Sequence, residues 1–156
     1  MEIRKATKKD LDGIVELSHQ LYLQQITVCQ DDVTLRKNFK TIQKRAISKD
    51  MKKRKNAFFV AEEKGELAGF ISGCIQEDPP VVVEREKGQI WAFYVKEEFR
   101  GRGIGKKLFA EMKKWFRKKK VKTARLYVVK CNVGAKRMYE KLGFEPAKVE
   151  QLILKM

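Results

Sequence analysis

Histidine and cysteine, the side chains that most often hold transition metals, are scarce in this sequence. One histidine, His19, and three cysteines, Cys29, Cys74 and Cys131, occur among 156 residues. None of them lies in a CxxC pair or a Cys/His cluster. A structural zinc site needs such a cluster, and a disulfide framework usually shows an even number of cysteines. The sequence therefore predicts no metal, and we expect three reduced, partly buried thiols.

Long apolar runs and prolines are also rare. No apolar run approaches the roughly 18 residues that cross a bilayer, and the first residues, MEIRKATKKD, contain no apolar signal-peptide segment. The chain has three prolines, no internal repeat and no low-complexity block. Because 43% of the residues are hydrophobic, the composition is that of a folded chain. We expect one domain over residues 1–156, soluble and cytoplasmic, with no membrane partner.

Acidic residues are few relative to basic ones. Lys and Arg total 36 against 20 Asp and Glu, which gives a formal net charge of +16. Such an excess favours polyanionic partners, namely nucleic acid, an anionic surface or a phosphorylated cofactor. Abundant lysine and glutamate also occur in proteins adapted to heat. Charge alone does not separate these interpretations.

The spacing of apolar residues predicts alternating strands and helices. The predicted strands are residues 2–6, 57–63, 66–77, 89–95, 124–129 and 149–154, and the predicted helices are 11–21, 35–51, 104–116 and 135–142. Residues 89–129 form a strand, a helix and a second strand, which predicts a right-handed βαβ crossover. The expected fold class is α/β of the α+β type. It is a single domain whose central sheet is mixed, mostly antiparallel, and flanked by helices.

The stretch EEFRGRGIGKKLF at residues 97–109 places three glycines at alternate positions between a predicted buried strand and an amphipathic helix. It does not fit a P-loop, because Arg100 and Lys107 stand where glycine and Ser or Thr are needed. It does not fit a dinucleotide fingerprint either, because Lys106 replaces the third glycine. A disordered arginine-glycine tract would not continue into an apolar helical stripe. Two interpretations remain: a pyrophosphate cradle of backbone N–H groups, and a simple tight turn.

The stretch resembles the cofactor motif of the GNAT superfamily, the acetyl-CoA-dependent N-acetyltransferases. The run Arg100-Gly101-Arg102-Gly103-Ile104-Gly105 matches the family pattern [QR]-x-x-G-x-[GA] at every fixed position. The second family motif, N-x-x-A-x-x-x-Y-x-x-x-G-F, is matched by Asn132, Ala135, Tyr139, Gly143 and Phe144. The resemblance implies a GNAT-like domain with a βαβ cofactor-binding unit, acyltransferase activity, and acetyl-CoA as the acetyl donor.

The resemblance also implies which residues bind acetyl-CoA. The backbone of Phe93 and Val95 would pair with the pantetheine arm, Asn132 would contact the same arm, and Tyr139 would face the thioester sulfur and protonate the leaving thiolate. The pyrophosphate would be held by Arg100, Gly101, Arg102, Gly103, Gly105 and Lys106. From the residues alone, Asn132 is equally an ordinary helix N-cap and Tyr139 a core aromatic, so these alternatives stay open.

The general base for the acceptor amine is not evident. A lysine-like amine with a pKa of about 10.4 must lose a proton before it attacks, yet the strand QIWAFYV at 89–95 contains no acid. Tyr127 occupies the position at which relatives that acetylate protein N-termini often carry an acid. The acids that could act through water are Glu84, Glu86, Glu77 and Asp78, and entry of an already neutral amine is the alternative. Direct attack by the amine is favoured over an acetyl-cysteine at Cys131, which has no histidine nearby in the sequence.

We therefore expect an N-acetyltransferase whose acceptor is a primary amine of a small molecule or a protein lysine. The segment Gln24 to Asp32, which ends in two acids, is expected to wall the acceptor side. The alternative is a non-catalytic acetyl-CoA-binding or nucleic-acid-associated protein with the same fold, which the basic face at Lys113 to Lys120 supports. Nucleic acid is not favoured as a partner, and a homodimer stays open.

Overall fold

The computed structural model describes residues 1–30, 34–81, 83 and 86–148 of the chain, and its elements follow the predicted order. The strands are β1 (Glu2–Lys5), β2 (Asn56–Glu63), β3 (Glu66–Glu77), β4 (Glu86–Val95) and β5 (Ala124–Arg125). The helices are α1 (Leu11–Cys29), α2 (Phe39–Asp50), α3 (Ile104–Lys118) and α4 (Val133–Lys141). The predicted strand 149–154, the candidate base Glu84, and Asp31 and Asp32, the two acids that end the expected acceptor-side segment, lie outside the described residues.

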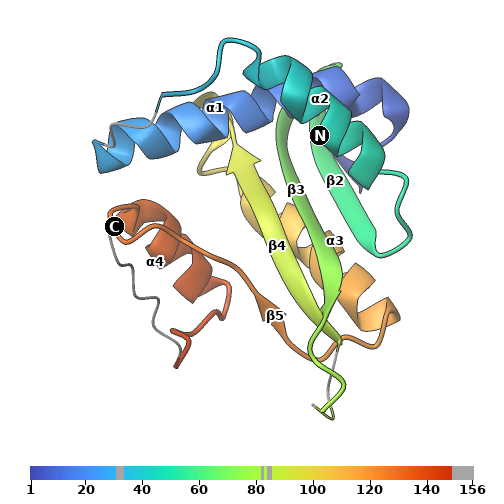
Figure 1. The fold of residues 1–156 in the computed structure, drawn as a ribbon. Coiled ribbons are helices and arrows are strands. Elements are labelled where there is room, and N and C mark those ends of the chain that lie inside the picture. The colour runs from blue at the N-terminus through green and yellow to red at the C-terminus, as the bar shows by residue number, and fades with distance from the viewer. Residues whose placement is uncertain (31–33, 82, 84–85, 149–156) are drawn as a thin grey trace.

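The strands form one mixed sheet in the order β1-β2-β3-β4-β5. Neighbours from β1 to β4 pair antiparallel, whereas β5 pairs parallel to β4. The parallel pair arises because α3 crosses over between its two strands. Figure 1 shows α3 on one face of the sheet and α1 with α2 on the other. The predicted mixed, mostly antiparallel sheet with a βαβ unit is confirmed.

The core has two parts, one on each face of the sheet, because successive strand residues point to opposite faces. On β2, Phe59 packs with Leu108 and Met112 of α3. Its neighbours Phe58 and Val60 point the other way and belong to the cluster that includes α1 and α2. The apolar stripes predicted on the helices therefore face the sheet from both sides.

The pairing of β3 with β4 shifts by one residue at Trp91. Ile90 pairs with Gly73 and Ala92 pairs with Ser72, so Trp91 is an extra residue in β4. An extra residue of this kind is a β-bulge, which bends the strand and changes the direction of the side chains that follow. The sequence analysis did not predict this bulge.

The bulge decides which residues of β4 face which helices. Ile90 and Phe93 both belong to the cluster around α3. Ala92 and Tyr94 pack against the cluster of α1 and α2 instead. In an uninterrupted strand, residues 90 and 93 would point to opposite faces. The bulge thus brings Phe93 to the same side as α3 and the loop that precedes it.

Two predicted boundaries were wrong in informative ways. The strand predicted at 124–129 pairs with β4 only at Ala124 and Arg125, because β4 bends at its bulge just beyond the paired residues. The first helix is longer than predicted, since α1 continues to Cys29. The residues Gln24 to Cys29, expected to lie between two helices, are instead the last turns of α1.

Candidate functional site

The glycine-rich stretch forms the connection from β4 to α3. Gly101 and Gly103 have φ angles of 77° and 75°, a left-handed conformation that most side chains disfavour. A Cβ added at either glycine would meet no atom within 4 Å. Glycine is therefore needed for conformation here, and the space beside the loop is open. Gly103 is also the N-cap of α3, whose first N–H groups have no partner within the helix and can bind an anion.

Arg100 links this loop to both β4 and α1. Its Nε donates to the carbonyl oxygen of Val95 at 2.9 Å, and its Nη2 donates to Oε1 of Gln24 at 2.9 Å. Arg102 contacts Glu63 instead, with 3.5 Å between Nη1 and Oε2. The two arginines thus have protein partners that hold the loop in place, a role that the sequence did not indicate. The side chain of Lys106 is exposed in the first turn of α3.

A cleft of about 300 Å³ lies next to this loop, between β4 and α4. It exists because β5 pairs with β4 only at Ala124 and Arg125, so the two chains separate farther along. We call it the β4–α4 cleft. Five residues predicted to bind the cofactor line it: Phe93, Val95, Arg100, Asn132 and Tyr139. Its remaining wall includes Leu21, Gln24 and Gln25 of α1.

Asn132 and Tyr139 enter the cleft from α4. Oδ1 of Asn132 accepts a hydrogen bond from the N–H of Ala135 at 3.0 Å, so Asn132 is a helix N-cap as well as a wall residue. The Tyr139 ring packs between Phe93 and Phe144, with ring centres 6.2 Å and 5.9 Å away. Burial raises the pKa of the Tyr139 phenol above its usual value. The hydroxyl therefore keeps its proton at neutral pH and is able to donate it.

A model of the acetyltransferase (GNAT) family matches residues 20–144, which span both the glycine loop and α4. The chain belongs to the GNAT family. It is 34% identical over 140 residues to an uncharacterized N-acetyltransferase of Archaeoglobus fulgidus, covering 89% of each chain. The GNAT fold is also that of a Bacillus halodurans protein, solved as a tetramutant, which matches with a TM-score of 0.85, 24% identity and 100% of each chain. A predicted acetyltransferase of Clostridium acetobutylicum, solved with acetyl-CoA, matches with a TM-score of 0.80 and 18% identity over 99% of this chain and 95% of that one.

Membership of the GNAT family makes acetyl-CoA the expected co-substrate, and the loop can be tested for its fit. The cofactor's pyrophosphate needs open space beside several backbone N–H groups, and both occur at Gly101 and Gly103. Gly105 faces inward, since a Cβ there would lie 3.4 Å from the Phe93 ring. A Cβ at this position would be in van der Waals contact with the wall of the cleft. The loop and cleft therefore fit a phosphate group followed by a narrow chain.

The candidate bases that the structure describes, Glu77, Asp78 and Glu86, do not line the β4–α4 cleft of this GNAT domain. Glu86 begins β4, at the opposite end from Val95, and lies 3.5 Å from Lys55. Glu77 also contacts Lys55, while Asp78 lies 2.5 Å from Lys87. Strand β4 rises about 3.3 Å per residue. Glu86 therefore lies roughly 20 Å along the strand from Phe93, which lines the cleft beside Tyr139. Among the described residues that line the cleft, none is an aspartate or a glutamate.

The expectation of three reduced thiols was wrong. Cys29 at the end of α1 is disulfide-bonded to Cys131, which directly precedes Asn132, and the two Cα atoms are 5.4 Å apart. Cys74 is the free cysteine of the described chain, and its burial raises the pKa of its thiol. The pair was missed because 102 residues separate the two cysteines, and because the predicted end of the first helix fell before Cys29. Sequence spacing alone does not give disulfide connectivity.

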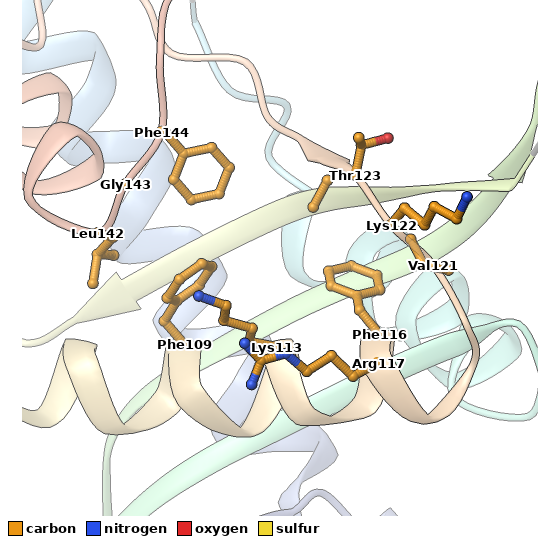
Figure 2. Close-up of a pocket in the computed structure, with 11 residues that line it drawn as sticks. Phe109, Lys113, Phe116, Arg117, Val121, Lys122, Thr123, Leu142, Gly143 and Phe144 are labelled. Atoms are coloured by element: carbon orange, nitrogen blue, oxygen red, sulfur yellow. The ribbon is translucent and has the colours of Figure 1, made fainter. Parts of the chain in front are cut away.

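A separate cavity of about 320 Å³ lies along the second half of α3. Figure 2 shows Phe109, Phe116 and Phe144 around it, with Lys113 and Arg117 extending from the helix. None of the residues predicted to bind acetyl-CoA lines this cavity. It is therefore distinct from the β4–α4 cleft, and its cations belong to the basic face predicted at Lys113 to Lys120.

Within the described ranges, no three His, Cys, Asp or Glu side chains gather closely enough to hold a metal ion. None of the described helices is both long and apolar enough to span a bilayer.

Proposed function

We propose that this GNAT domain transfers the acetyl group of acetyl-CoA to a primary amine by direct attack of the amine on the thioester. One observation carries the proposal: Arg100, the first residue of the glycine motif, and Tyr139 of α4 line the same β4–α4 cleft. The loop beside the cleft would bind the phosphates, the cleft would hold the pantetheine arm, and Tyr139 would be the proton donor. These are the groups that acetyl transfer from a phosphorylated thioester needs.

The loop and β4 would bind and orient the donor. Backbone N–H groups at Gly101 to Lys106 would hold the pyrophosphate, because they lie at the N-terminus of α3 where the helix dipole favours negative charge. The pantetheine arm would lie along β4 beside Phe93, in the space that β5 leaves open. Arg100 keeps that passage in place through its contacts with Val95 and Gln24.

Tyr139 would act as the general acid. When the amine forms its bond to the acetyl carbon, the C–S bond breaks and the sulfur leaves as a thiolate. The Tyr139 hydroxyl, which is protonated at neutral pH, gives that thiolate a proton. The attacking nitrogen loses a proton as the amide forms, and this proton returns through water to the Tyr139 phenolate. The products are the acetylated amine and free CoA.

The amine would lose its proton without a carboxylate in the cleft. Deprotonating a lysine-like amine at about pH 7 costs roughly 5 kcal/mol, whereas an α-amine of pKa about 8 costs only about 1 kcal/mol. Because the described cleft has no acid, the proton would go to water, and amines of lower pKa would react faster. We assign no base role to Glu86, which lies at the far end of β4 with Lys55.

Calorimetry with acetyl-CoA, followed by thiol release with a panel of primary amines, tests this proposal. We expect acetyl-CoA to bind and at least one amine to release free CoA in step with amide formation. If acetyl-CoA does not bind, the enzyme proposal fails. Binding without turnover on any amine, together with salt-dependent affinity for DNA or RNA, would instead support the non-catalytic alternative, in which the +16 net charge engages nucleic acid.

A further inference from the structure

A pocket of about 340 Å³ lies on the other side of β4, beneath α1 and α2. We call it the α1–α2 pocket. Its aromatic walls are Tyr22 of α1, Phe58 of β2, Phe70 of β3 and Trp91 of β4, and Ala46 and Asp50 line it from α2. Leu21 and Gln25 line both this pocket and the β4–α4 cleft. The two spaces are therefore neighbours across one turn of α1, which Figure 1 shows lying over the end of β4.

The β4 bulge forms part of the wall of this pocket. Trp91 is the extra residue of the bulge, and both Trp91 and Ala92 line the pocket. Without the bulge, adjacent residues of β4 would point to opposite faces of the sheet. The bulge thus turns Phe93 toward the β4–α4 cleft and exposes Trp91 to the α1–α2 pocket.

The walls of the pocket are mostly apolar and partly open, and its uncharged polar lining residues are Ser18, Gln25, Gln43 and Ser72. Phe58 and Phe70 are 6% and 2% exposed and form its base, whereas Tyr22 and Trp91 are 40% and 44% exposed and stand at its rim. The Trp91 ring lies 6.3 Å from that of Phe58. Two large aromatic rings left in water beside a buried apolar base offer a surface that a ligand's apolar group would cover.

The charge of the pocket is low. Asp50 is the charged side chain among the described residues that line it. Its carboxylate is already paired with Lys53, at 2.8 Å between Oδ1 and Nζ. A polycation such as an aminoglycoside or a polyamine needs several unpaired acids, and the described walls do not provide them. An uncharged apolar group matches these walls better.

We propose that the α1–α2 pocket binds the side group of the acceptor, so that the acceptor is a primary amine carrying one uncharged, apolar group about the size of a benzene ring. This inference rests on the proposed acetyl transfer. With the side group under Trp91, the amine would pass Leu21 and Gln25 to reach the thioester beside Tyr139. The same chemistry occurs in a free arylalkylamine and in the first residue of a polypeptide.

A comparison of amines as substrates tests the proposed class of acceptor. Thiol release is measured with phenethylamine, ethylamine, putrescine and kanamycin, and with tripeptides that begin with Phe or Gly. With kcat/KM expressed per neutral amine, so that the difference in amine pKa is removed, we expect the value for phenethylamine to exceed that for ethylamine by about tenfold or more, because the larger apolar group fills more of an apolar pocket. A preference confined to the Phe tripeptide identifies a polypeptide source. Higher kcat/KM for putrescine or kanamycin would overturn the inference while leaving acetyl transfer intact.

A variant that fills the α1–α2 pocket tests whether the preference for phenethylamine arises there. Ala46 is exposed on α2 at the pocket, so Ala46→Trp should fill the space without disturbing the core. We expect the phenethylamine-to-ethylamine ratio to fall about tenfold. The matched control is Ala110→Trp, which places the same ring on the exposed side of α3 and should leave the ratio unchanged. An unchanged ratio in Ala46→Trp would contradict the assignment of the pocket.

The fluorescence of Trp91 reports ligand binding in the α1–α2 pocket without requiring catalysis. In a Trp115→Phe background the remaining tryptophan is Trp91, and phenethylamine should shift its emission in a saturable manner. Ala46→Trp cannot be used here because it adds a tryptophan, so Ala46→Phe serves to weaken the binding. No saturable shift would count against the pocket. If acetyl-CoA fails to bind while the shift persists, the proposed function fails and the pocket assignment survives.

Discussion

Cys29, in the last turn of α1, is covalently joined to Cys131, the residue before the N-cap of α4. The two Cα atoms are 5.4 Å apart although 102 residues separate them in sequence. Helix α1 contributes Leu21, Gln24 and Gln25 to one wall of the β4–α4 cleft, and α4 carries Asn132 and Tyr139 on the other. The disulfide therefore ties together the two walls between which the thioester is proposed to lie.

Loss of this disulfide should lower stability. Cross-linking residues about 100 apart restricts the unfolded chain, which corresponds to about 4.7 kcal/mol in the chain-entropy account and to roughly 2–4 kcal/mol in typical measurements. We expect Cys29→Ser with Cys131→Ser to lower the free energy of unfolding by that amount in urea titrations. Reductant should lower the wild-type value similarly and leave the double variant unaffected. Equal wild-type midpoints with and without reductant would contradict the prediction.

The two left-handed glycines of the loop should be needed for acetyl-CoA binding. Gly101→Ala or Gly103→Ala places a side chain where φ is 77° or 75°, at a conformational cost of roughly 1–2 kcal/mol. The loop can relieve that strain by changing shape, which would misdirect its N–H groups. We expect calorimetry to show acetyl-CoA affinity reduced about tenfold or more.

Gly65 provides the matched control for these glycines. It has φ of 83° in the turn between β2 and β3, and a Cβ there would also meet no atom within 4 Å. Gly65→Ala should therefore destabilise the fold about as much as the loop variants do, while acetyl-CoA affinity stays at the wild-type value. If all three variants lose affinity equally, the loop has no special role in binding.

Removal of the Tyr139 hydroxyl should slow the chemical step. Tyr139→Phe keeps the ring that packs on Phe93 and Phe144, so folding and acetyl-CoA affinity should be retained. General acids typically contribute about 100-fold or more to rate, and we expect kcat to fall by about that factor with little change in the KM for acetyl-CoA. Undiminished turnover in stopped-flow or steady-state assays would remove Tyr139 as the acid.

Asp10 should stabilise the protein in a pH-dependent way. Its carboxylate accepts hydrogen bonds from Arg4 at 2.8 Å and from the N–H of Thr7 at 2.7 Å. These bonds, mainly that from Arg4, lower the pKa of Asp10 from 3.8 to about 2. A pKa that is lower in the folded state gives stability that is present above about pH 4 and is lost as the pH falls toward 2.

The Asp10→Asn variant measures that contribution. It should reduce the free energy of unfolding by about 2 kcal/mol at about pH 7, with a difference from wild type that shrinks toward zero near pH 2. The control is Asp12→Asn, because Asp12 is 77% exposed and its ion pair with Lys44 lies at the surface. That variant should change stability little at any pH. A pH-independent loss in Asp10→Asn would show that the carboxylate's charge is not the cause.

The sequence predicted best where a local pattern dictates local structure. The apolar stripe at Ile104, Leu108 and Met112 became the buried face of α3, and these residues are 0–1% exposed. Gly101 and Gly103 adopt the left-handed conformation for which glycine is suited. Phe93, a predicted cofactor contact, and the motif residue Tyr139 are far apart in the chain and meet in the β4–α4 cleft.

What the sequence did not reveal depends on contacts between distant segments. The bulge at Trp91 follows from the pairing of β3 with β4, and no turn residue in β4 marks it. The early separation of β5 follows from that bend. The bond from Cys29 to Cys131 requires knowing how far α1 extends and where α4 begins. Likewise, Arg100 could be predicted as a phosphate ligand, but its contact with Gln24 is visible only in the fold.

Transfer of an isotope-labelled acetyl group tests the central claim most directly. The protein is incubated with acetyl-CoA labelled in the acetyl carbons and with phenethylamine, and the products are identified by mass spectrometry. We predict labelled N-acetylphenethylamine in stoichiometric amount with free CoA, formed by wild type and strongly reduced in Gly103→Ala. If acetyl-CoA binds but no labelled amide forms with phenethylamine or any other amine of the panel, this domain is not the N-acetyltransferase we propose.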